Sequence, residues 1–156
     1  MRNLYRLTAN GFGSGYLPVA PGTWGSAVAI LLALPLMWTT PAVSRLTLTL
    51  LAVVFSFLCA RAVDLFHDEW GDDPKHVVAD EMVGMWLTLV GIPLTAGNFL
   101  WGFLLFRFFD ITKPLGVRRL EDIPGGWGVV LDDVLAGVYA NVVLQLINLY
   151  FNANPF

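Results

Sequence analysis

The chain has 156 residues, enough for one domain and too few for two ordinary ones. Hydrophobic residues make up 56% of it and charged residues 13%, well below the ~25% typical of soluble proteins. A net charge of −3 leaves no basic surface for a phosphate backbone, which excludes nucleic acid as a partner. The composition therefore predicts an integral membrane protein with a single domain, residues 1–156.

Five apolar runs are predicted to be membrane-spanning helices. In chain order they cover residues 24–38, 46–63, 77–92, 99–109 and 129–151. Several are shorter than the ~20 residues that a perpendicular span needs. Either their polar flanks continue the helices, or the third and fourth runs form a shallow hairpin. The predicted fold class is all-α, a polytopic membrane helical bundle of about five short spans.

The charged residues fall on one side of this arrangement. With a cytoplasmic N-terminus, Arg45 is the only basic residue placed outside, and the other eight of the nine bases face the cytoplasm. This asymmetry is the positive-inside pattern. All twelve acids gather on the same inner side, although acids follow no sidedness rule. Their clustering therefore indicates a local function.

Five of these acids join directly onto apolar sequence. Asp80 and Glu81 enter the third run, Asp110 leaves the fourth, and Asp132 and Asp133 enter the fifth. Ionisable residues at such depth are costly and usually functional. Carboxylates from three helix ends would form an oxygen-rich pocket suited to a hard cation such as Mg²⁺. Helix-dipole stabilisation is the alternative, and it does not account for Asp110, at a helix C-terminal end.

The remaining acids are weaker candidates. Those predicted to be solvated loop charges are Asp68, Glu69, Asp72, Glu121 and Asp122, whereas Asp64 and Asp73 lie between the two groups. Neighbouring helix residues point ~100° apart. One member of each acidic doublet is thus expected to bind metal, and the other to orient water or a ligand.

The basic residues near Asp110 and the glycine-rich segments each allow two interpretations, one structural and one functional. Arg107 and Lys113 flank Asp110 as topology signals or as counter-charges for a phosphate. The glycine-rich stretches 11–15 and 21–26 either pack helices closely or present backbone amides to an anion. If these segments and bases bind an anion, the substrate-binding candidates are Thr23, Ser26, Arg107 and Lys113. The sequence has no Asp-x-Asp pair and no Cys-x5-Arg loop, so metal-activated water is the simplest hydrolytic mechanism.

Four stretches resemble motifs of the phosphatidylglycerophosphatase A family. They are GFGSGYLPVAPGTWGS (11–26), DPKHVVADEMVGMW (73–86), FRFFDITKP (106–114) and GGWGVVLDDVLAG (125–137). The resemblance implies a Mg²⁺-dependent phosphatase of phospholipid biosynthesis. Such an enzyme removes the terminal phosphate of phosphatidylglycerophosphate, yielding phosphatidylglycerol, at the cytoplasmic face of a bacterial inner membrane.

The resemblance also implies which residues form the site. The catalytic candidates are Asp80, Glu81, Asp110, Lys113, Asp132 and Asp133, and the expected metal ligands among them are Glu81, Asp110, Asp132 and Asp133. A cation- or proton-coupled transporter is the competing function, since intramembrane acids also mark ion pathways. Depth separates the two, because a transporter needs acids near the midplane and these gather at one boundary. A structural membrane subunit, the third class, would tolerate neutralised acids.

Overall fold

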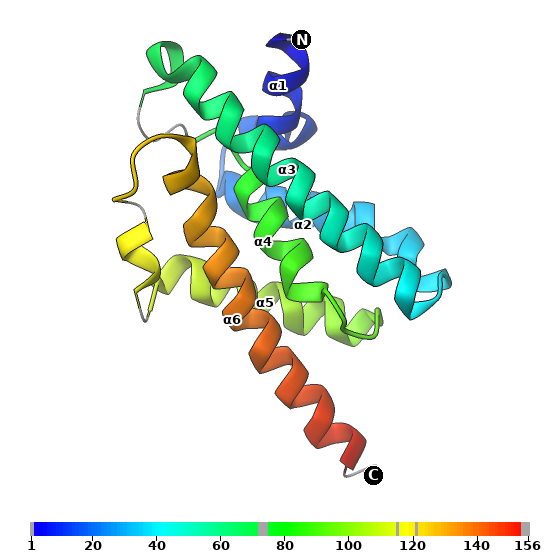
Figure 1. Cartoon of the computed structure of the whole chain (residues 1–156). Coiled ribbons are helices and arrows are strands. Elements are labelled where there is room, and N and C mark those ends of the chain that lie inside the picture. Colours follow the sequence, from blue (N-terminus) through cyan, green and yellow to red (C-terminus); the bar gives the residue numbers. More distant parts are fainter. Residues whose placement is uncertain (1, 72–74, 115, 121, 154–156) are drawn as a thin grey trace.

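The computed structural model describes residues 2–71, 75–114, 116–120 and 122–153. Across these residues the chain forms helices and no strand, as the all-α prediction requires (Figure 1). The elements are α1 (Arg2–Ala9), η1 (Gly11–Tyr16), α2 (Pro21–Ala33), η2 (Leu34–Trp38), α3 (Pro41–Trp70), α4 (Ala79–Leu89), α5 (Ala96–Thr112), η3 (Val117–Leu120) and α6 (Gly126–Ala153). Asp72, Asp73 and Glu121 lie outside the described residues.

Among the residues that the structure describes, three helical segments are long and apolar enough to cross a membrane: Pro21–Trp38, Pro41–Trp70 and Gly126–Phe151. In α3 the polar flank continues the helix beyond the apolar run, as far as Trp70. The 30 residues of α3 reach about 45 Å, more than a ~30 Å hydrocarbon core. Pro41 at the first turn and the Thr40 hydroxyl, which accepts from the Val43 amide, fix where α3 begins.

The helix α4 lies inside the bundle. It contacts α2, α3, α5 and α6 (Figure 1), and its 11 residues extend only about 16 Å. Trp86 is fully buried, and its indole Nε1 donates to the Ala29 carbonyl at 2.9 Å. A Cβ added at Gly137 of α6 would lie 2.5 Å from the Gly84 carbonyl oxygen, so glycine permits this close crossing. The run at 77–92 is therefore apolar because protein surrounds it.

The turn between α4 and α5 lies at the opposite end of α4 from the acids. Asn141 of α6 donates to the Thr88 and Val90 carbonyls, both at 2.9 Å. Asn98 donates to the Pro93 carbonyl at 2.8 Å. The Asn141 amide thus satisfies carbonyls that the end of the short helix α4 leaves open, and the Asn98 amide holds the turn itself. The turn shares a cavity of about 270 Å³ with the loop between η2 and α3, so both turns lie at the same end of the bundle.

The N-terminal helix α1 was not among the predicted elements. It packs against the last turns of α3, at the far end of the molecule from the end of α6 (Figure 1). Arg2 and Arg6 both form ion pairs with Glu69, and their guanidinium groups lie 5.2 and 4.6 Å from the centre of the Phe66 ring. Exposed pairs of this kind contribute little, about 0–1 kcal/mol each. Glu69, predicted to be a solvated loop charge, is thus a helical residue with partners.

Candidate active site

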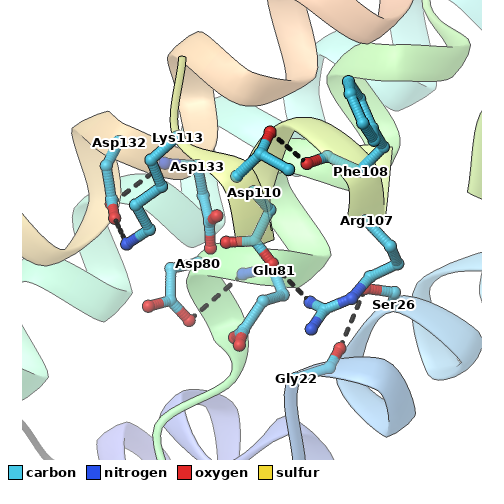
Figure 2. Close-up of polar contacts among 11 residues, drawn as sticks. Gly22, Ser26, Asp80, Glu81, Arg107, Phe108, Asp110, Lys113, Asp132 and Asp133 are labelled. Carbon is cyan, nitrogen blue, oxygen red and sulfur yellow. Dashed lines mark hydrogen bonds and ion pairs between the residues drawn. The ribbon is translucent and has the colours of Figure 1, made fainter. Parts of the chain in front are cut away.

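All six predicted catalytic residues line one cavity of about 660 Å³. Figure 2 shows how their side chains lie. Asp80 and Glu81 stand in the first turn of α4, and Asp110 stands in the last turn of α5. Lys113 ends α5 in a left-handed conformation (φ 45°, ψ 52°) that turns the chain away before Pro114. The side chains of these residues point toward one another from three helices, as the clustering of acids led us to expect.

Three carboxylates form the centre of this cavity. One oxygen each from Asp80, Glu81 and Asp133 lies within 4.8 Å of the other two. Glu81 Oε2 and Asp133 Oδ1 are buried and have no hydrogen-bond partner in the described part of the chain. Buried, unpartnered carboxylate oxygens are costly, and a divalent cation would satisfy them. A set of donors made only of oxygen suits Mg²⁺, so the residues present fit this ion.

The other two carboxylates pair with bases. Asp132 Oδ2 lies 2.7 Å from Lys113 Nζ, and Asp110 Oδ2 lies 2.6 Å from Arg107 Nη1. The expected metal set is therefore divided: Glu81 and Asp133 are in the central group, whereas Asp110 and Asp132 face cations. Asp80 takes a central place that the sequence did not assign to it.

The doublets also behave differently from each other. Asp132 and Asp133 face different neighbours, because Asp133 lies in the central group and Asp132 pairs with Lys113. Asp80 and Glu81 both belong to the central group. The Asp80 carboxylate accepts from the Glu81 amide at 3.1 Å, which holds it over the start of α4.

Asp64 holds the start of α6. Its Oδ1 accepts from the Gly126 amide at 2.7 Å. A Cβ at Gly126 would lie 2.0 Å from the Ala60 carbonyl oxygen, so α6 begins in direct contact with α3. The helix therefore starts before residue 129, and Asp132 and Asp133 occupy its second turn instead of its first. The sequence signal for Asp64 was an acid at the end of an apolar run, which alone did not reveal this role.

The glycines of α2 serve close packing. A Cβ at Gly22 would lie 2.0 Å from Glu81 Oε1, and one at Gly25 would lie 2.7 Å from Val78 Cβ. The Ser26 hydroxyl donates to the Gly22 carbonyl at 2.9 Å. The Thr23 backbone amide donates to the Ala20 carbonyl at 2.9 Å. Neither Thr23 nor Ser26 belongs to the described lining of the cavity, so the structure gives these two substrate-binding candidates no contact with it.

The structure therefore combines helices of membrane-spanning length with carboxylates and bases that share one cavity at the helix ends. The family model for phosphatidylglycerophosphatase A matches residues 7–148, and the chain belongs to this family. No solved structure matches the chain.

Named relatives agree on a phosphatase. Phosphatidylglycerophosphatase A of Haemophilus influenzae is 37% identical, covering 91% of this chain and 87% of its own length. The Escherichia coli protein of the same name is 34% identical, covering 94% and 85%. A Bacteroides thetaiotaomicron protein named "Putative phosphatidylinositol-3-phosphatase" is 44% identical, covering 90% and 91%. The chain is therefore a phosphatase.

Proposed function

We propose that the protein hydrolyses phosphatidylglycerophosphate to phosphatidylglycerol and phosphate, with Mg²⁺ as cofactor, at the cytoplasmic face of a bacterial inner membrane. The observation that carries the proposal is the convergence of Asp80, Glu81 and Asp133 with unpartnered buried oxygens, beside two bases, at the ends of apolar helices. The family and two of its named members support the lipid headgroup.

Each group then has a chemical task. Asp80, Glu81 and Asp133 would hold Mg²⁺, which supplies Lewis-acid polarisation of a phosphoryl oxygen and a water nucleophile at neutral pH. Lys113 and Arg107 place positive charge on two sides of the acids, where the nearly dianionic phosphomonoester must bind. Asp132 and Asp110 hold these two cations in place through their ion pairs. Gly22 leaves the space that the Glu81 carboxylate occupies.

A second headgroup follows from the relative in Bacteroides thetaiotaomicron, whose name specifies a phosphatidylinositol phosphate. Phosphate release by the purified protein with Mg²⁺ should therefore be compared between phosphatidylglycerophosphate and phosphatidylinositol 3-phosphate. We expect the larger kcat/KM for phosphatidylglycerophosphate. A reversed preference would assign the chain to inositol lipids, and turnover of neither lipid would refute the proposed function.

The proposed topology has five crossings with a cytoplasmic N-terminus. It is supported by the positions of the η2–α3 loop and the α4–α5 turn. Both lie beside Arg45, at the end of the bundle opposite the acidic cavity. A reporter that is active only outside the cytoplasm should work when fused after Phe151 and fail when fused within the loop at 116–120. Arg118 and Arg119 in that loop belong to the positive-inside side. A silent C-terminal fusion with an active cytoplasmic reporter would contradict five crossings.

A further inference from the structure

Three cations line the site cavity, and they differ in their partners. Arg107 pairs with Asp110 and Lys113 with Asp132, at the distances given above. Lys75 is exposed, and no hydrogen bond or ion pair joins it to any residue that the structure describes. Two of the cations are thus already neutralised by carboxylates, and the third is available at the cavity mouth.

The residues that follow Lys75 are held in place by several contacts. The neighbouring His76 ring stacks on Tyr16 at 5.6 Å and meets the Trp70 ring edge-on at 4.8 Å. Partial burial lowers the pKa of His76 from its usual value, which favours the neutral ring. The Val78 amide donates to the Ala9 carbonyl at 2.8 Å. These contacts hold the backbone that follows Lys75, and the Lys75 side chain lines the acidic cavity.

The charge balance of the cavity gives this ammonium a task. Among the described lining residues, five carboxylates outnumber the two paired bases, so an approaching anion meets a negative field. Phosphatidylglycerophosphate brings two anionic groups, a terminal phosphomonoester and a phosphodiester nearer the acyl chains. When the monoester enters between the acids and the paired bases, the diester stays toward the mouth. A flexible ammonium can bind such a group without fixed geometry.

We propose that Lys75 binds the bridging phosphodiester of the lipid and thereby favours substrates that carry a diester as well as a terminal phosphomonoester. The inference rests on the proposed function of the cavity as a lipid phosphatase site. It assigns a selective role to a residue that the sequence marked only as a topology signal. The shared ligand is the diester, whether the headgroup beyond it is glycerol or inositol.

Kinetics in neutral detergent micelles test this role. Lys75→Gln should raise KM about fivefold for phosphatidylglycerophosphate at low salt, with kcat changed little, because one exposed charge contact is lost. The difference should shrink at 1 M salt, where screening removes such contacts. Lys75→Arg should keep the wild-type KM. Arg119→Gln changes an exposed base outside the described cavity lining and serves as the matched control.

Binding of a lipid without a diester completes the test. Affinity without Mg²⁺ should fall for phosphatidylglycerophosphate and phosphatidylinositol 3-phosphate in Lys75→Gln, and stay constant for phosphatidate, whose phosphate joins diacylglycerol directly. An equal loss for all three lipids would mean that Lys75 acts on the monoester or on the fold, and would overturn the proposal. An unchanged affinity for all three would overturn it too. If the wild-type protein hydrolyses neither phosphatidylglycerophosphate nor phosphatidylinositol 3-phosphate, the proposed function is refuted. The binding comparison would still test the role of Lys75 in that case.

Discussion

Asp133→Asn should lower kcat for phosphatidylglycerophosphate at least about a hundredfold while leaving the protein folded. Asp133 contributes an oxygen to the central carboxylate group, and its Oδ1 is buried without a partner. An amide keeps the size of the side chain and loses the charge that a divalent cation requires. A hundredfold loss corresponds to about 2.7 kcal/mol of transition-state stabilisation, within the range of a lost metal contact. Glu81→Gln should behave in the same way.

The matched control for Asp133→Asn is Asp122→Asn. Asp122 is exposed and lines a neighbouring cavity with His67, outside the described lining of the active site. Its substitution should leave kcat near the wild-type value. Steady-state phosphate release by the purified variants, with thermal unfolding to confirm folding, provides the comparison. Full Mg²⁺-dependent activity in Asp133→Asn would show that the central carboxylates are not the metal site.

Lys113→Gln should lower kcat/KM by about ten- to a hundredfold. Its ammonium is 2.7 Å from Asp132 Oδ2, and both side chains are largely buried. Removing the cation leaves a buried carboxylate uncompensated beside four others, which is far more costly than losing an exposed pair. It also removes positive charge from the place where we propose that the phosphomonoester binds. The loss should therefore appear in kcat/KM at every salt concentration, in contrast to the effect of Lys75→Gln.

Two further variants test whether Lys113 acts in catalysis, as a topology signal or only through its charge. Lys113→Arg should recover activity only in part, because a planar guanidinium does not replace a compact ammonium. Arg118→Gln alters a base of the same loop and should leave kcat/KM unchanged. Membrane orientation should be normal in all three variants, since the remaining bases of the loop preserve the positive-inside signal. If Lys113→Gln had wild-type kinetics, Lys113 would be only a topology signal and would have no role in catalysis.

The sequence predicted the helical class and the convergence of the acids for clear physical reasons. Apolar runs interrupted by charged segments specify helices in a membrane, and charges at the ends of such runs must meet at the boundary. It could not distinguish a helix that faces lipid from one enclosed by protein, because both environments select apolar residues. The burial of α4 therefore became visible only in three dimensions, through contacts such as that of Trp86 with Ala29.

The sequence also could not show which residues pair with the individual charged side chains. Asp64 and Gly126 are 62 residues apart in the chain, and Lys113 and Asp132 are 19 apart. No local pattern encodes such pairs, because they depend on how the helices cross. The sequence therefore could not show that Asp110 and Asp132 face bases, or that Asp80 lies with Glu81 and Asp133 in the central group.

The Mg²⁺ dependence of phosphate release by the purified wild-type protein tests the central claim most directly. The substrate is phosphatidylglycerophosphate in detergent micelles, and the free metal concentration is set with a chelator. We predict no release in excess chelator and a saturable return of activity as Mg²⁺ is restored, with phosphatidylglycerol as the lipid product. Undiminished release in excess chelator would contradict a metal site formed by Asp80, Glu81 and Asp133.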